Sequence, residues 1–346
     1  MHKVGVIGIG FGLGVHVPAF RLDSRCEVAA ICASTAERAA GAAEKGAIPK
    51  AFGDWRELVA DPAIDIVSIA TPAAAQYEIA RAAIEAGKQV FLEKPLAPTA
   101  GQGRELMELA EKHDVRTSLD FEFIETPGWP ELKQTLDSGK LGNLRVVNID
   151  WQVNSYAIQN GFFDSWKLRP DEDGGVLNLF GTHTFHYLEW LFGPICRLRA
   201  HLPGLPGLPG EVEALALLQI EFKNGAQGSV SLSSASFQGN GHRLEIYGSK
   251  GRACLQNPTK DYIRGFELEI GDSETGERRE VELEEDGDLE RDGRIAPVSR
   301  MVRRFVDTIE EDREGSPNIT DGWRVQRWID IARASAKSGE WLTFDA

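Results

Sequence analysis

The sequence predicts an α/β protein with a doubly wound parallel sheet at the N-terminus, followed by an α+β domain on a mostly antiparallel, open-faced sheet. Over the first 121 residues, short β-branched runs alternate with helical patterns, which is typical of βαβ units. Farther along, strand-like runs follow one another with few helical stretches between them. The 346 residues suffice for two domains, which we expect at 1–121 and 122–346.

In the first domain, helix signals separate the strand-like runs. Residues 34–37 and 54–57 fit capping boxes, and Gly87 lies where a helix over 75–86 would end. The runs expected to form the parallel sheet are 4–9, 27–32, 65–70, 89–92 and 116–121.

In the second domain, strand-like runs outnumber helical ones. Expected strands are 144–153, 195–201, 212–222, 227–233, 243–247 and 262–270. Expected helices are 130–138, 175–192, 298–312 and 321–338.

Charge and cysteine usage limit the classes of function. With 38 Lys and Arg against 53 Asp and Glu, the net charge of −15 disfavours nucleic acid and anionic membranes as partners. The four cysteines show no C-x-x-C pair and no zinc spacing, so we expect no metal site and a reducing compartment. The sequence shows no secretory leader and no membrane span, and we expect a cytoplasmic protein.

A glycine-rich loop follows the first expected strand and opens a helix. Glycines at this place allow a tight turn and let backbone amides approach a pyrophosphate, which predicts a Rossmann dinucleotide site. A merely glycine-rich turn is the alternative interpretation. The residues expected to bind the cofactor here are Gly8, Gly10, Phe11, Gly12 and Leu13.

The second expected strand ends without the acid that usually binds the 2′-hydroxyl of NAD. Ser34, Thr35 and Arg38 follow it and can bind a 2′-phosphate instead, which favours NADP over NAD, although NAD stays possible. Alternatively, Ser34 only caps the helix and Arg38 only faces solvent.

Several short motifs occur in order along nearly the whole chain. They are Val15-His16-Val17-Pro18-Ala19, Thr71-Pro72, Glu93-Lys94-Pro95 and Gly181-Thr182-His183. Together they resemble the glucose-fructose oxidoreductase, inositol 2-dehydrogenase and rhizopine catabolism (Gfo/Idh/MocA) family. The Glu-Lys-Pro element after a strand is the most specific of them.

The resemblance implies a nicotinamide-dependent oxidoreductase that acts on a CH–OH group of sugars, cyclitols or their derivatives. Lys94 would stabilise the developing alkoxide and His183 would exchange the hydroxyl proton. Thr71, Pro72, Glu93 and Pro95 would bind the cofactor together with Lys94. A surface lysine at a strand end and an interior histidine are the simpler alternatives for the two catalytic residues.

The sequence departs from the family pattern near His183. Leu179 replaces the usual acid four positions earlier, with Asn178 beside it, and His186 replaces a common aspartate. Gln76 stands where a histidine often occurs. These departures keep two other functions open: a non-catalytic sugar or dinucleotide sensor, and a glycosidase that uses the cofactor for transient oxidation.

Aromatic and polar residues before the His183 helix suit a polyol, with core packing as the alternative for the tryptophans. We expect Trp166, Lys167, Asn178 and His186 to contact substrate.

The second sheet is also expected to form an oligomer interface. Apolar residues alternate along two of its strands and would pair face to face in a homodimer or homotetramer. They are Ala214, Ala216, Leu218, Val230 and Leu232.

Overall fold

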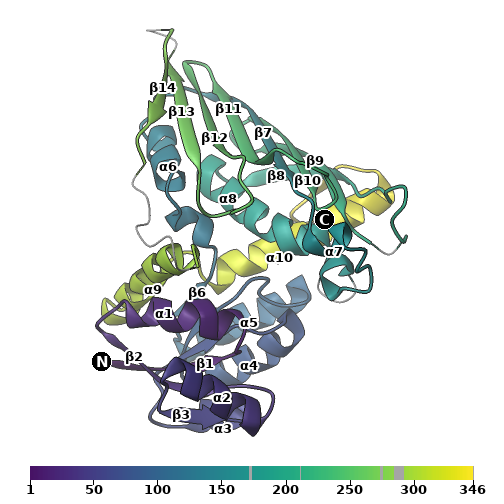
Figure 1. The fold of residues 1–346 in the computed structure, drawn as a ribbon. Helices are drawn as coiled ribbons and strands as arrows, with labels where there is room; N and C mark the ends of the chain where they lie inside the picture. Colours follow the sequence, from purple (N-terminus) through teal and green to yellow (C-terminus); the bar gives the residue numbers. More distant parts are fainter. Residues whose placement is uncertain (171–173, 211, 273–275, 284–291, 346) are drawn as a thin grey trace. The chain divides into compact units, whose positions relative to one another are not determined.

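The computed structural model of the chain describes residues 1–170, 174–210, 212–272, 276–283 and 292–345. The chain forms two compact units, 1–125 with 288–326 and 126–287 with 327–346 (Figure 1). Residues 288–326, which the sequence analysis placed in the second domain, pack with the first compact unit. The reason is α9 (Ile295–Glu310), which packs against elements of the first unit and buries its apolar residues there.

The first unit contains a six-stranded parallel sheet, as predicted. In sheet order its strands are β3 (Lys50–Phe52), β2 (Cys26–Cys32), β1 (His2–Ile7), β4 (Ile66–Ile69), β5 (Gln89–Leu92) and β6 (Thr117–Leu119). Its helices, besides α9, are α1 (Val17–Arg21), α2 (Ala36–Gly46), α3 (Trp55–Ala60), α4 (Ala73–Glu85) and α5 (Ala100–His113).

The strand order changes direction between β1 and β4. From β1 the chain proceeds outward to β2 and β3, and from β4 it proceeds the other way to β5 and β6. Right-handed crossovers then place α1 and α4 on opposite faces of the sheet. Accordingly, α1 packs with α9, and α4 packs with α5.

The strand β3 is absent from the sequence-based prediction. It has three residues at the sheet edge, and Lys50 and Ala51 are exposed, so it lacks the β-branched run that marks the other strands. The C-terminus of α4 matches its prediction, because Gly87 follows the helix with a φ of +69°.

The second unit is built on a nine-stranded sheet. Among the described residues, its strands pair antiparallel except for β7 with β10, which confirms the predicted mostly antiparallel sheet. In sheet order the strands are β14 (Arg278–Val281), β13 (Glu267–Asp272), β12 (Gly251–Asn257), β11 (Gly241–Gly248), β7 (Leu144–Gln152), β10 (Gln227–Ser233), β9 (Leu215–Phe222), β8 (Ile195–His201) and β15 (Leu342–Thr343).

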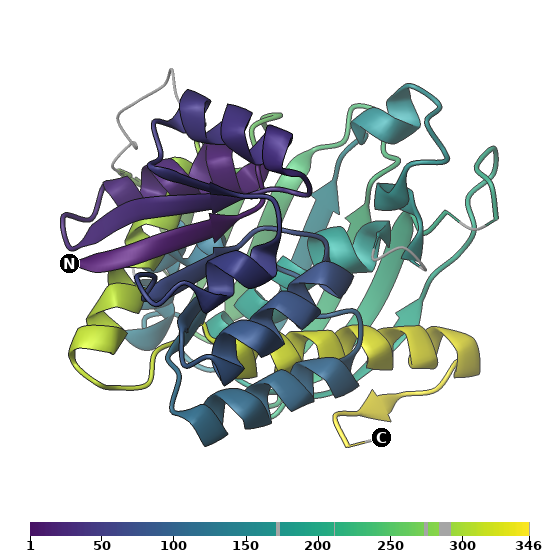
Figure 2. The ribbon, with the colours of Figure 1, turned by 90° about the horizontal axis from the view of Figure 1, so that it is seen from below.

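The helices of this unit include α6 (Trp129–Asp137), α7 (Tyr156–Gln159) and α8 (Thr182–Phe192). The long helix α10 (Ile319–Ser338) belongs to the first unit up to residue 326 and to the second from residue 327. Figure 2 shows α10 in yellow, leading to β15 at the C-terminus. No helix within the described ranges is long and apolar enough to cross a membrane.

The apolar residues expected at an oligomer interface lie on the other face of the sheet. Ala216 and Leu232 are fully buried, and Ala214, Leu218 and Val230 are at most 3% exposed, so they belong to the core of this unit. The prediction assigned them to the uncovered face, and this was wrong because alternation alone does not say which face meets the helices. The large apolar residues that strands of this sheet do expose are Val146, Leu217 and Tyr247.

Candidate active site

The glycine loop lies where the strand order changes direction. Gly8 follows β1 with a φ of +116°, and a Cβ there would lie 2.2 Å from the carbonyl oxygen of Ala70, which follows β4. Only glycine fits, because both the dihedral angle and the close approach exclude a side chain. Open α/β sheets bind ligands at the carboxyl ends of their strands at such a switch point.

The rest of the loop leaves room for a ligand. A Cβ at Gly10 or Gly14 would meet no atom within 4 Å, whereas one at Gly12 would lie 3.1 Å from Val6. Residues Gly12–His16 form a π-helical turn, a feature frequent at functional sites. The open glycines give the backbone amides space for a pyrophosphate, so the loop fits the dinucleotide predicted from the sequence.

Two side chains of the loop pack on the protein. A Cβ at Gly46 of α2 would lie 3.0 Å from Leu13 Cδ1, so Leu13 packs against this helix. The Phe11 ring contacts His16 edge-on at 5.2 Å, and the Arg294 guanidinium lies 4.8 Å from its centroid. We therefore expect Leu13 to serve a cofactor through its backbone.

The segment after β2 carries hydroxyls and a guanidinium. Thr35, in extended conformation, is the N-cap of α2 and accepts a hydrogen bond from the Arg38 backbone N–H. The Arg38 guanidinium donates to Ser34 Oγ at 2.7 Å. The capping box predicted from Ser34 to Glu37 is thus wrong by one residue: Thr35 caps the helix and Ser34 binds Arg38.

The remaining predicted cofactor residues follow neighbouring strands. Thr71 and Pro72 follow β4, and the Glu93-Lys94-Pro95 turn follows β5. In the described part of the chain, the buried Thr71 Oγ1 has no hydrogen-bond partner. Because β2, β1, β4 and β5 are consecutive and parallel, all the predicted cofactor residues gather at one edge of the sheet.

Gln76, from α4, fixes the turn that contains Lys94. Its side-chain amide donates to the carbonyl oxygens of Pro95 at 2.9 Å and Leu96 at 3.3 Å, and its oxygen accepts from the Glu93 N–H at 3.2 Å. Gln76 is fully buried, so each lost bond would leave a buried polar group unsatisfied. The sequence marks Gln76 only as a departure from the family pattern, whereas the structure gives it this role.

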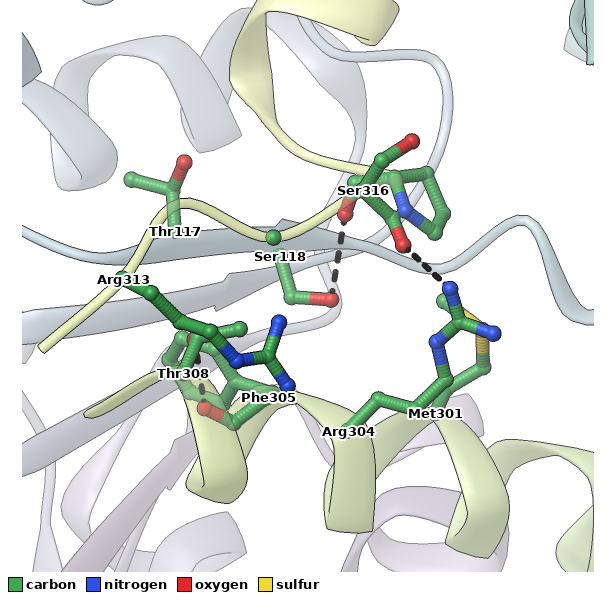
Figure 3. A pocket seen from close by; sticks show the side chains of 10 residues that line it. Thr117, Ser118, Met301, Arg304, Phe305, Thr308, Arg313 and Ser316 are labelled. Atoms are coloured by element: carbon green, nitrogen blue, oxygen red, sulfur yellow. Dashed lines mark hydrogen bonds between the residues drawn. The ribbon is translucent and has the colours of Figure 1, made fainter. Parts of the chain in front are cut away.

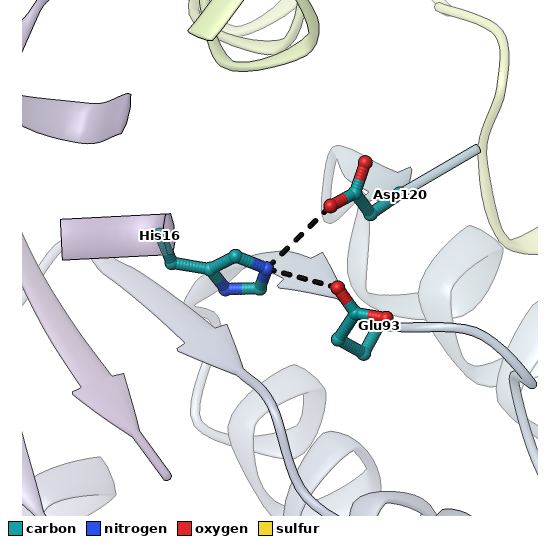
Figure 4. Close-up of side chains that lie close together, drawn as sticks. All are labelled: His16, Glu93 and Asp120. Carbon is teal, nitrogen blue, oxygen red and sulfur yellow. Dashed lines mark hydrogen bonds and ion pairs between the residues drawn. The ribbon is translucent and has the colours of Figure 1, made fainter. Parts of the chain in front are cut away.

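A buried charged cluster lies behind the same turn (Figure 4). His16 Nε2 is 3.2 Å from Glu93 Oε1 and 3.6 Å from Asp120 Oδ2, while His16 Nδ1 is 2.8 Å from the Ser68 hydroxyl. The side chains of His16 and Asp120 are fully buried, and that of Glu93 is 15% exposed. The sequence shows His16 within a family motif, but its partners lie far along the chain and only the fold brings them together.

The cluster places two carboxylates beside one imidazole. Only a protonated imidazole can offset their negative charge. Burial alone would lower the pKa of His16, but Asp120 and Glu93 outweigh it and raise that pKa to about 9. Burial raises the pKa of Asp120, against the opposing effect of His16. Burial also raises the pKa of Glu122, which lies two residues farther along, and the charges of Asp120 and Glu93 act in the same direction.

Raising the pH from 6.5 to 9 is expected to lower the free energy of unfolding. Folded His16 keeps its proton up to about pH 9, whereas the unfolded chain releases it near the ordinary histidine pKa of 6.5. This stabilisation is complete below pH 6.5 and is lost as the pH rises through 9, a loss of up to about 3 kcal/mol. The raised pKa of Asp120 acts with the same sign.

Urea denaturation at both pH values measures this loss. His16→Gln should show a smaller pH-dependent loss, whereas the control His113→Gln, on α5, should follow the parent. Equal slopes in the parent and His16→Gln would contradict the assignment of the proton to His16.

In the second unit, His183 and His186 lie on α8, directly after a π-helical turn at Leu177–Gly181. They are 5% and 7% exposed, and their spacing of three places them on one helix face. This degree of burial agrees with two interpretations of these histidines: proton acceptors in a closed active site, or side chains packed in the protein interior.

The usual acid before His183 is not replaced at the same place. Leu179 is half-buried, while Asn178 is 4% exposed and its Oδ1 lacks a hydrogen-bond partner among the described residues. Glu213 lies nearby but accepts from the Leu177 N–H at 3.1 Å and pairs with Arg333 at 3.3 Å. The amide oxygen of Asn178 is thus a buried acceptor without a hydrogen-bond partner in this part of the chain.

Of the aromatic candidates, Trp166 is accessible and Trp151 is not. Trp166 is 44% exposed, with Lys167 Nζ 6.0 Å from its ring centroid. Trp151 is 4% exposed and stacks between Phe180 at 4.6 Å and His242 at 4.2 Å, so it belongs to the core.

A small cavity of about 100 Å³ lies elsewhere in the first unit, against β6 and α9 (Figure 3). Arg304 lines it and already donates to the Ser316 carbonyl at 2.9 Å and to Glu125 at 2.8 Å. None of the site residues predicted from the sequence lines this cavity.

The arrangement of glycine loop, Thr-Pro turn and Glu-Lys-Pro turn agrees with family models. The model of the Gfo/Idh/MocA oxidoreductase family with an NAD-binding Rossmann fold matches residues 2–121, and that of its C-terminal alpha/beta domain matches 133–344. The chain belongs to the Gfo/Idh/MocA family. The predicted resemblance and the fold class are thereby confirmed.

Several Gfo/Idh/MocA relatives match most of the chain. An uncharacterized oxidoreductase of Synechocystis is 33% identical, over 98% of this chain and 95% of its own. Levoglucosan dehydrogenase of Pseudarthrobacter phenanthrenivorans is 27% identical, over 98% of this chain and 97% of its own. The structure of levoglucosan dehydrogenase with NADH and levoglucosan has a TM-score of 0.88 at 25% identity, and the match covers 99% of this chain and 98% of that one.

Proposed function

We propose that this Gfo/Idh/MocA protein transfers a hydride between a nicotinamide cofactor and a hydroxyl or carbonyl group of a sugar, cyclitol or related compound. The observation that carries the proposal is the position of Lys94. It follows β5 at the edge of the sheet where the glycine loop leaves room for a dinucleotide. Relatives named levoglucosan dehydrogenase and myo-inositol 2-dehydrogenase support the substrate class.

The residues at this edge fit a dinucleotide. The amides of the loop from Gly8 to Leu13 would hold the pyrophosphate, and Thr71, Pro72 and the Glu93-Lys94-Pro95 turn would border the nicotinamide end. Ser34, Thr35 and Arg38 would receive a 2′-phosphate, so we propose a preference for NADP over NAD.

The bound nicotinamide supplies the hydride acceptor or donor. The Lys94 ammonium would stabilise the developing alkoxide, and His183 would take the hydroxyl proton in oxidation or return it in reduction. His186, on the same helix face, would orient His183 or accept its proton in place of the missing acid. Trp166 would offer a flat apolar face to the substrate, with Lys167 and Asn178 as polar contacts.

A polyol panel tests this function. The purified protein is incubated with NADP or NAD and each sugar or cyclitol, and absorbance of reduced cofactor is recorded. We expect at least one substrate to give sustained reduction that depends on Lys94.

The two other functions predict different results. A sensor would bind cofactor tightly and give no turnover with any member of the panel, and the replacement of the usual acid by Leu179 is what favours it. A transient oxidation during glycoside hydrolysis would release free sugar from a glycoside without accumulating reduced cofactor.

We also propose a homodimer or homotetramer formed through the uncovered face of the second sheet. A groove of about 550 Å³ on this unit is lined by exposed Leu217 together with polar residues such as Ser229. Light scattering at micromolar concentration should give a mass of two or four chains, and Leu217→Glu should lower it. The control Leu22→Glu, at an exposed leucine of the first unit, should not, and a monomeric parent would reject the proposal.

The cysteines support a reducing compartment, and we propose a cytoplasmic location. All four thiols are free, and Cys26, Cys32 and Cys254 are buried.

A further inference from the structure

The Glu93 carboxylate connects a buried histidine to the backbone of Lys94. Its Oε1 lies 3.2 Å from His16 Nε2, and its Oε2 accepts a hydrogen bond from the Lys94 N–H at 3.2 Å. One side chain therefore joins the helical turn after the glycine loop to the residue proposed to act on the substrate.

The ring of His16 is held in place from both ends. Ser68, a fully buried residue of β4, is hydrogen-bonded to Nδ1, and this directs Nε2 towards the two carboxylates (Figure 4). Burying two adjacent carboxylates without a cation is unfavourable, so a protonated imidazole is the form that fits this position. Both carboxylates share that one cation, because Asp120 has no hydrogen-bond donor among the described residues and lies 3.6 Å from Nε2.

We propose that His16 is a positioning residue: its imidazolium holds the Glu93 carboxylate against Asp120 and thereby fixes Lys94 in its reactive position. The inference rests on the proposed role of Lys94. Without the imidazolium, the Glu93 carboxylate would repel an ionised Asp120 or turn towards a protonated one, and in either case it would leave the Lys94 N–H.

Gln76 holds the backbone of the Glu93-Lys94-Pro95 turn independently of His16, so the positioning role of His16 can be tested apart from the folding of the turn. It binds the backbone groups of Glu93, Pro95 and Leu96 without touching the Glu93 carboxylate in any described contact. The turn thus keeps its backbone anchors when His16 is replaced, and the expected change is a displacement of Lys94 within a folded protein.

The test compares His16→Gln with the double variant His16→Gln/Asp120→Asn. Glutamine keeps a donor near the carboxylates but has no charge, and the second substitution removes the repulsion that this leaves. If His16 only filled space, the second substitution would restore none of the activity lost in His16→Gln. The surface variant His113→Gln is the matched control.

Two readouts are taken. The first is kcat and KM on the best polyol with NADP. The second, which needs no substrate, is the rate at which acetic anhydride acetylates Lys94 relative to exposed Lys112, followed by mass spectrometry.

In His16→Gln we expect kcat to fall at least about tenfold, because a misplacement of about 1 Å can cost up to about a hundredfold, while KM changes less than about threefold. The relative acetylation of Lys94 should slow at least about threefold, because its side chain is then no longer held in its reactive position. The double variant should recover a substantial part of both losses, and His113→Gln should match the parent.

The proposal is overturned if folded His16→Gln keeps the parent's kcat and labelling rate, or if the double variant recovers neither. It is also overturned if the purified protein carries one divalent metal ion per chain that the cluster variants lose, since the ion would then hold the carboxylates. If His16→Gln does not fold, Ser68→Ala, which removes only the partner of Nδ1, should lower kcat and Lys94 labelling about threefold, and unchanged values would overturn the proposal.

The labelling experiment distinguishes failure of the catalytic role of Lys94 from failure of the positioning role of His16. If Lys94→Ala stays active, the catalytic role of Lys94 fails. A slowed labelling of Lys94 in His16→Gln would even then show that His16 positions it.

Discussion

Lys94→Ala is expected to lower turnover at least about a hundredfold on the best polyol substrate. Lys94 follows β5 at the edge of the sheet that holds the glycine loop, and removal of its ammonium leaves the developing alkoxide without its stabilising charge. The dissociation constant for NADP, measured by fluorescence titration, should rise less than about threefold, because the loop amides carry most of the binding.

The control for this experiment is Lys112→Ala on the exposed surface of α5, which should keep parental kcat. His183→Ala should lower kcat less severely, because solvent or His186 can accept the proton. Near-full activity of Lys94→Ala on the true substrate would reject the proposed chemistry.

Isothermal titration is expected to show NADP binding at least about tenfold more tightly than NAD. The segment after β2 places Ser34 Oγ 2.7 Å from the Arg38 guanidinium, and both groups can bind a 2′-phosphate. Loss of charge-assisted contacts of this kind costs about 1 to 3 kcal/mol, which corresponds to a tenfold or larger preference.

Ala33→Asp should reverse this preference, because a carboxylate at the end of β2 repels a 2′-phosphate and can bind a 2′-hydroxyl. The backbone there is held by the hydrogen bond from the Ala33 N–H to the Phe52 carbonyl at 3.2 Å, so the new side chain should keep a defined place. Ala40→Asp adds the same charge on the exposed face of α2 and should leave the preference unchanged. Equal affinities in the parent would contradict the assignment.

The parts of the fold that the sequence predicted are those with a local signal. The run at residues 89–92 became β5 at its predicted bounds because three apolar residues in a row mark a strand buried on both faces. The edge strand Lys50–Phe52 has no such signal, since an exposed three-residue strand owes its conformation to its neighbour β2.

Errors arose where the decisive contact is remote in sequence. Alternation along β9 correctly showed that Ala216 and Leu218 share a face, but which face meets the helices depends on how the second unit is assembled. The packing of 288–326 on the first sheet could not be predicted for the same reason, because the apolar stripe of α9 fits either sheet until the packing is known.

The candidate site shows the same division. Gly8, Lys94 and the absence of an acid after Cys32 can be found from motifs and spacing. The buried partners of His16 cannot, because Glu93 lies 77 residues away and Asp120 follows a different strand. Only the order of β1, β4, β5 and β6 in the sheet brings these side chains together.

The return of α9 to the first sheet affects how the protein is made on the ribosome. Val302, Phe305 and Val306 are at most 2% exposed, and the Phe305 ring lies 5.9 Å from that of Phe91 in β5. The first unit is interrupted after residue 125 and resumes at residue 288, so about 160 residues are translated between its two parts. At roughly 5 to 20 residues per second, this face of the nascent sheet waits about 10 to 30 s for its covering helix. During that time its apolar surface is open to chaperones and to other nascent chains, and the N-terminal unit completes its folding only near the end of synthesis.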